Sequence, residues 1–154
     1  MPSILGIAKG GTMRQAELIV KDAKYIPEER FAFCPAGCAK TAKDILAEIA
    51  SGNVMLGAAI AQEGPDEEFT KRVAQATTLE VLGKLVIESA EKACRVMDSL
   101  SEADLDREVT MPWGAKFRIG EAIFLPISHM TYHDGQINYI QTLLGDSKFH
   151  WAEG

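Results

Sequence analysis

The chain has 154 residues, of which 47% are hydrophobic, 25% are charged and only 7% are aromatic. This length and balance favour one globular domain over residues 1–154 and exclude a disordered chain. The formal net charge of −6 would repel a phosphate backbone, so nucleic acid is not an expected partner. The longest uncharged apolar run, residues 54–61, is far shorter than the roughly 20 residues of a membrane-spanning helix, so no membrane association is expected.

The cysteines and the N-terminal residues bear on the compartment. Residues 1–6 lack a basic segment followed by a long apolar run, which argues against an export signal. The three cysteines are an odd number, and together these features predict a cytoplasmic protein with reduced thiols. Cys34 and Cys38 flank a Pro-Ala-Gly sequence, which predicts a turn before a helix, with reversible thiol chemistry as the less favoured alternative.

Helical periodicity predicts two helices in the N-terminal half of the chain. The first covers residues 11–25 and ends before Pro27. The second runs from Thr41 to Gln62, because Thr41 and Asp44 have the spacing of an N-terminal capping box.

Two more helices are predicted in the C-terminal half. A capping-box pattern opens the third, over residues 77–99, and the fourth covers residues 120–144 and ends at Gly145. Residues 105–119 between them contain turn residues and predict a loop or short hairpin. Pro126 lies inside the fourth helix and predicts a kink. The expected fold is an all-α, antiparallel four-helix bundle.

The predicted fourth helix carries two of the three histidines in the chain. His129 and His133 are spaced i, i+4, and Gln136 lies one turn further along, so the three side chains share a face. Leu125 and Ile140 continue that face as a core-facing stripe. Two buried imidazoles need hydrogen-bond partners, water or a metal ion, so this face is predicted to hold the functional site.

Glu48 interrupts the stripe predicted to face the core on the second helix, whose other members are Ile45, Gly52, Met55 and Ala59. In an antiparallel bundle, Glu48 faces both histidines. Two imidazoles and a carboxylate suit Zn²⁺, Ni²⁺, Fe²⁺ or Mn²⁺, with a position open for water or substrate. Tyr132 and Gln136 are candidates for hydrogen bonds to the ligands or substrate. The alternative is a metal-free hydrogen-bond network between Glu48 and the histidines.

The sequence His129-x3-His133-x-Gly135-Gln136, followed by an apolar run, resembles the final-helix signature of the DinB/YfiT-like metal-binding superfamily of four-helix bundles. Residues 41–50 resemble its second-helix signature, in which the third metal-binding residue is usually histidine, and Glu48 stands at that position here. The resemblance implies a bundle, often a homodimer, that holds zinc or nickel, with iron or manganese as further options for this ligand set. Some relatives also use a low-molecular-weight thiol such as bacillithiol or mycothiol.

Two functions are consistent with these predictions. The first is a metal-dependent enzyme, a thiol-dependent transferase or a hydrolase, that acts on a small molecule. The second is a non-catalytic, dimeric metal-binding or stress-associated bundle protein. Asp134 is a candidate orienting or acid/base group, and the alternative is that it faces solvent on the far side of its helix. His150 is expected at the surface or at a dimer contact, and it is a fourth ligand only if the tail folds back.

Overall fold

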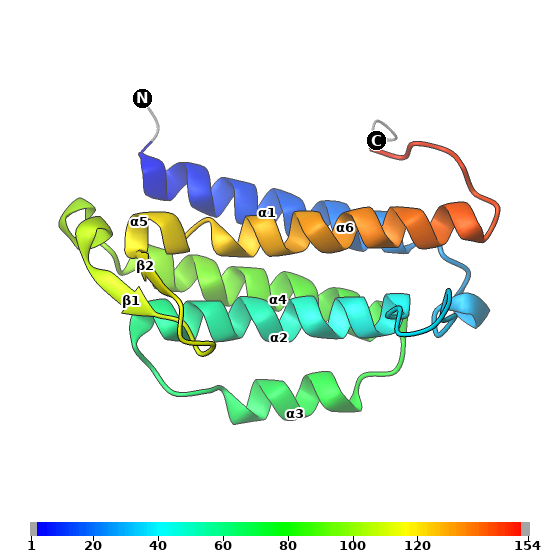
Figure 1. The fold of residues 1–154 in the computed structure, drawn as a ribbon, viewed down its shortest axis with the longest axis horizontal. Helices are drawn as coiled ribbons and strands as arrows, with labels where there is room; N and C mark the ends of the chain where they lie inside the picture. The colour runs from blue at the N-terminus through cyan, green and yellow to red at the C-terminus, as the bar shows by residue number, and fades with distance from the viewer. Residues whose placement is uncertain (1–2, 152–154) are drawn as a thin grey trace.

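The computed structural model describes residues 3–151, and within them four long helices form a bundle (Figure 1). These helices are α1 (Ile4–Ala23), α2 (Ala42–Ala61), α4 (Leu79–Asp98) and α6 (Leu125–Leu143). Helix α2 packs against α4 and α6, and α1 packs against the same two helices. The prediction of an all-α bundle is confirmed.

The chain directions in this bundle are set by the additional helix α3 (Glu67–Gln75), which returns the chain to the end where α2 began (Figure 1). Helices α2 and α4 therefore run in the same direction, and each runs opposite to α1 and α6. Helix α3 was not predicted, because only nine residues carry its periodicity and two of them, Phe69 and Val73, are buried. Asp66 caps it by accepting a 2.9 Å hydrogen bond from the Phe69 amide.

Capping places the starts of α2 and α4 where the sequence predicts them. The Thr41 hydroxyl accepts from the Asp44 amide at 3.1 Å, and the Asp44 carboxylate accepts from the Thr41 amide at 3.2 Å. Thr78 accepts from the Val81 amide at 3.3 Å. Each bond satisfies an amide that has no partner inside its helix.

Two predicted helix boundaries differ from the structure. Helix α1 begins at Ile4 instead of Gly11, because the Ser3 hydroxyl caps it by accepting from the Gly6 amide at 3.1 Å. Gly11 lies inside the helix at a packing position, where an added Cβ would lie 2.7 Å from Ile127 Cδ1. The predicted fourth helix is divided into the short α5 (Ile119–Ala122) and α6. The predicted kink at Pro126 is not needed, because Pro126 lies in the first turn of α6, where its position needs no amide donor.

A hairpin follows α4, as predicted for residues 105–119. Strands β1 (Glu108–Thr110) and β2 (Lys116–Arg118) pair antiparallel, with Val109 opposite Phe117. Short 3₁₀ turns at Glu28–Arg30 and Glu102–Asp106 complete the elements of residues 3–151. In Figure 1, the hairpin lies at one end of the bundle and the C-terminal segment at the other.

Helix α2 is long and apolar enough to cross a membrane by length and composition, with a mean hydropathy of 1.3. Half of that window is buried inside the bundle, where Ile45, Leu46 and Ile49 belong to the main core cluster. Helix α2 is therefore the core helix of a soluble-type fold. In the segment before α2, Cys34 and Cys38 are exposed and not disulfide-bonded, which agrees with the predicted turn.

Candidate metal centre

The structure brings Glu48, His129 and His133 together at the contact between α2 and α6. One ligand atom from each residue lies within 4.8 Å of the other two. His133 Nε2 is 3.1 Å from His129 Nε2 and 3.6 Å from Glu48 Oε1. The i, i+4 spacing places both imidazoles on one face of α6, and the antiparallel course of α2 brings the carboxylate to that face.

Gly52 makes room for the His129 ring. It lies one turn after Glu48 on α2, and a Cβ atom at this position would be 2.6 Å from His129 Cε1 and 3.0 Å from His129 Nδ1. Any larger residue would therefore push the imidazole away from the other two groups. The i+4 spacing of Gly52 from Glu48 is visible in the sequence, but spacing alone predicts only a core position for Gly52.

Gln136 and Tyr132 fix the orientation of His133. The buried His133 ring donates from Nδ1 to Gln136 Oε1 at 2.7 Å, and Gln136 Nε2 donates to the Tyr132 hydroxyl at 3.2 Å. Because an amide oxygen only accepts, the proton of the neutral imidazole resides on Nδ1. The Nε2 lone pair of His133 therefore points toward His129 and Glu48.

His129 is held neutral and is incompletely bonded. Burial lowers the pKa of His129 below its ordinary value, the neighbouring His133 lowers it further, and Glu48 offsets part of this effect. Its Nδ1 atom is buried and has no hydrogen-bond partner within residues 3–151. A buried nitrogen of this kind has a cost in folding free energy that a hydrogen bond would offset. Because Nδ1 is on the other side of the ring from Nε2, an ion held beside His133 would not contact it.

Glu48 is located differently from the predicted position. The sequence analysis placed it in the core-facing stripe of α2, but Ile45 and Ile49 face the core and the Glu48 side chain is 39% exposed. Lys40 pairs with its carboxylate from the segment before α2. Partial burial raises the pKa of Glu48, but Lys40 and the two histidines outweigh that effect and hold the pKa below its usual value.

The three residues fit a divalent transition metal ion. Ligand atoms about 2.1 Å from one zinc ion lie roughly 3.0 Å apart at a right angle and roughly 3.4 Å apart at the tetrahedral angle. The observed separations of 3.1 Å and 3.6 Å are close to these values. The lowered pKa values of Glu48 and His129 favour an ionised carboxylate and a neutral imidazole, which are the protonation states that metal binding requires.

Two residues for which a surface position was considered are buried elsewhere. His150 stacks on Tyr25 with ring centroids 3.5 Å apart, and it bonds to Asp146 at 2.8 Å. The tail therefore folds back onto α1 and does not bring His150 to the histidine pair. Asp134 is buried against α1 beside Asp22. Both surface positions were wrong because the C-terminal segment and α1 cover surfaces that periodicity along one helix cannot reveal.

The Asp22 and Asp134 side chains form a second buried polar cluster that the sequence analysis missed. Burial raises the pKa of Asp134 to about 7, and the adjacent Asp22 raises it as well. Amide and indole groups surround the carboxylates. Gln15 donates to Asp134 at 3.3 Å, and Asn138 and Trp151 donate to Asp22 at 3.3 Å and 3.1 Å.

No protein-family model matches the chain, and no curated protein matches its sequence. Solved structures do match its fold. A DinB-like protein of Bacillus subtilis, YjoA, has a TM-score of 0.71 and 19% identity, covering 92% of this chain and 94% of that chain. A conserved protein from Enterococcus faecalis has a TM-score of 0.74 and 15% identity, covering 91% and 96%.

A mutant of the mycothiol-dependent maleylpyruvate isomerase has a TM-score of 0.68 and 14% identity. The match covers 89% of this chain and 63% of the isomerase chain. The fold of this protein is therefore the DinB-like helical bundle, and the resemblance inferred from the α2 and α6 motifs is confirmed at the level of the fold.

Proposed function

We propose that Glu48, His129 and His133 hold one divalent transition metal ion and that the chain is a metal-dependent enzyme. The observation that carries this proposal is the convergence of three ligand atoms within 4.8 Å from two helices, with the Nδ1 proton of His133 directed away from them onto Gln136. When bound, such an ion supplies Lewis-acid chemistry, which activates water or thiol nucleophiles near neutral pH.

The surrounding residues have separate roles in this proposal. Gln136 and Tyr132 are positioning residues, because their hydrogen bonds orient the His133 ring. Lys40 helps to keep the Glu48 carboxylate ionised. Zinc and nickel suit the two imidazoles, while the carboxylate also makes iron and manganese acceptable.

For the reaction, we propose a thiol-dependent transfer or a hydrolysis of a small molecule in the cytoplasm. The thiol is suggested by the name of one structural neighbour, the mycothiol-dependent isomerase. Nucleic acid is not proposed as a partner, because the formal net charge is −6.

The test is metal content and zinc affinity of chelator-stripped protein, measured for wild type and Glu48→Gln. We expect about one ion per chain in the wild type and an affinity at least about 100-fold lower in the variant, since one ligand is lost. Glu80→Gln is the matched control, because Glu80 also pairs with a lysine, Lys84, on an exposed surface. Full zinc affinity in Glu48→Gln would remove this residue from the ligand set.

A second candidate function is a non-catalytic, dimeric metal-binding protein. The observation that favours it is a stripe on α6 of exposed apolar side chains, in which Tyr132, Tyr139 and Leu143 are 65%, 62% and 46% exposed. Their i, i+7 and i+11 spacing places them on one face of the helix, and large exposed apolar patches often bind partners. Sedimentation velocity measures the dimer, and absence of turnover by the metal-loaded dimer with thiol and hydrolytic substrates would favour this candidate over the enzyme.

A further inference from the structure

A pocket of about 390 Å³ opens beside His129, where α2 and α6 meet the tip of the hairpin. The side chains that define its character are Met55, Leu56, Trp113, Leu125 and Tyr132. None of its lining residues is Asp, Glu, Lys or Arg. The pocket therefore offers an uncharged surface directly next to the proposed metal ligands.

Three large apolar side chains are exposed at this pocket. Trp113 is 55% exposed, Tyr132 is 65% exposed and Met55 is 40% exposed. Single exposed apolar residues are ordinary on protein surfaces, but their gathering around one concave site is typical of ligand binding. These side chains contribute little to the core of the bundle. Core packing therefore does not explain why they gather around this pocket.

The hairpin holds Trp113 in place. The Met111 amide donates to Ala115 O at 2.8 Å, and the Gly114 amide donates to Met111 O at 2.8 Å. Gly114 has a φ of +88°, a conformation that glycine adopts without strain. Val109 and Met111 are buried and anchor the turn. Trp113 is therefore presented from a fixed loop, which lowers the entropy lost when a ligand binds.

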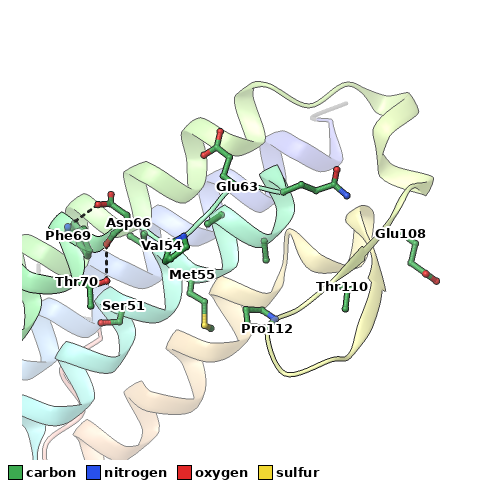
Figure 2. A pocket seen from close by; sticks show the side chains of 14 residues that line it. Ser51, Val54, Met55, Glu63, Asp66, Phe69, Thr70, Glu108, Thr110 and Pro112 are labelled. Carbon is green, nitrogen blue, oxygen red and sulfur yellow. Dashed lines mark hydrogen bonds between the residues drawn. The ribbon is translucent and has the colours of Figure 1, made fainter.

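A larger pocket of about 650 Å³ lies on the other side of Met55, between α2, α3 and the hairpin. Figure 2 shows Met55 pointing from α2 toward the hairpin segment that carries Pro112. This larger pocket is lined in part by Glu63, Asp66 and Glu108 and does not include His129. Only the smaller pocket combines an uncharged lining with contact to the proposed metal centre.

We propose that the pocket formed by Met55, Trp113, Leu125 and Tyr132 binds an uncharged aromatic ring of the substrate, whose reacting group then lies at Glu48, His129 and His133. An aromatic ring is favoured because it stacks or makes edge contacts with Trp113 and Tyr132 and packs against the Met55 sulfur. This inference rests on the proposed function and adds a substrate class to it.

The experiment compares acetohydroxamate and benzohydroxamate as inhibitors or ligands of the zinc-loaded protein. Both present the same metal-binding group, and only the second carries a ring. We expect benzohydroxamate to bind about tenfold more tightly. Each fully buried carbon raises the affinity about fourfold, and the open pocket buries only part of the ring. Trp113→Ala should reduce the ratio to about twofold. Trp113→Phe and Phe149→Ala should preserve it, since Phe149 is exposed outside this pocket.

A second measurement tests the pocket without metal. Benzamide, an uncharged aromatic probe, is titrated into chelator-stripped protein while the two indole N–H resonances are followed by NMR. We expect the Trp113 signal to shift and the Trp151 signal, whose N–H is bonded to Asp22, to remain in place.

The outcomes separate the two proposals. Zinc binding with equal affinity for the two hydroxamates would overturn the aromatic pocket and leave the metal centre intact. A Trp113 shift with benzamide in a protein that binds no zinc would overturn the proposed function while retaining the pocket. Conversion of a dimer into a monomer by Trp113→Ala, with the hydroxamate ratio unchanged, would identify the pocket as a contact between two copies of the chain and overturn its assignment to a substrate.

Discussion

His133 and Asp134 are neighbours on α6, yet they point into two different buried polar clusters. His133 joins Glu48 and His129, where one potential ligand atom of each residue converges and His129 Nδ1 lacks a hydrogen-bond partner within residues 3–151. Asp134 joins Asp22 on the opposite side of the helix. The first cluster reaches the surface through Glu48, which is 39% exposed and pairs with Lys40. A metal ion bound there would compete with Lys40 for the carboxylate.

The aspartate cluster has the opposite character. Its carboxylates receive hydrogen bonds from Gln15, Asn138 and Trp151, and a proton held on Asp134 removes one of its two charges. These donors come from α1, α6 and the C-terminal segment, so the cluster fastens the tail to the bundle. The comparison shows that a buried polar atom without a partner does not by itself define a functional site, because Asp22 Oδ1 lacks a hydrogen-bond partner within residues 3–151, as His129 Nδ1 does. What distinguishes the first cluster is the convergence of three potential metal-ligand atoms.

The largest predicted effect concerns the pH dependence of the aspartate cluster. The pKa of Asp134 is raised to about 7 in the folded protein, above the value of about 3.9 expected in the unfolded chain. The folded state therefore binds this proton more tightly, so the associated stability is present below about pH 4 and is lost as pH rises toward about 7. Asp134→Asn removes this dependence.

The measurement is the free energy of unfolding by urea between pH 4 and 8, in the presence of chelator so that histidine titration is common to all variants. The difference between wild type and Asp134→Asn should change by up to about 4 kcal/mol across that range. Asp106→Asn is the control, since Asp106 is largely exposed. A constant difference between wild type and Asp134→Asn would show that the pKa of Asp134 is not raised in the folded protein.

The sequence predicted the two clusters unequally, for physical reasons. His129, His133 and Gln136 lie on one helix, so their spacing alone determines that they share a face. Glu48 was correctly brought to that face, although only Ile45 and Gly52 of its predicted core stripe are buried. The environment of Asp134 depends on α1 and on the C-terminal segment, and the spacing of residues along α6 contains no information about either contact.

The same distinction applies to the fold. The starts of α2 and α4 were predictable because Thr41 and Thr78 cap their helices through local hydrogen bonds. Gly11 was misinterpreted as a helix start because its close contact with Ile127 is a tertiary feature. The crossover by α3 makes α2 and α4 parallel. It was not predicted, because α3 is too short to show a long periodic pattern.

A smaller predicted effect tests whether the metal-centre cluster depends on the close contact between α2 and α6. Gly52→Ala should lower zinc affinity about tenfold, because the new methyl group displaces His129. Gly57→Ala on the same helix is the matched control, since its Cβ would meet Ala93 Cα at an ordinary 3.5 Å. Both substitutions gain similar helix propensity, so their difference isolates the contact with the imidazole. Equal zinc affinities for the two variants, measured by titration calorimetry, would refute the positioning role of Gly52.

The smallest predicted effect concerns Lys40. It tests whether the Glu48 carboxylate is available to a metal ion or is already held by its own ion pair. Lys40 competes with a metal ion for the Glu48 carboxylate, and its charge also repels the ion. It lowers the pKa of Glu48 as well, but a carboxylate with an ordinary pKa of about 4.3 is already ionised at pH 7. The competition of Lys40 with the metal ion therefore outweighs its effect on the pKa of Glu48. Lys40→Gln should raise zinc affinity about threefold at low salt, with a smaller gain at high salt.

Lys84→Gln is the control for Lys40→Gln, because it removes a lysine from an exposed pair with Glu80 on α4. Zinc affinity is measured by competition with a chromophoric chelator at two salt concentrations. A decrease in affinity in Lys40→Gln would mean that Lys40 holds the carboxylate in the orientation that binds metal. Lys40 would then be a positioning residue for Glu48, as Gln136 is for His133. The Glu48 carboxylate would in that respect resemble the aspartates on the other side of α6, which are held by hydrogen-bond donors.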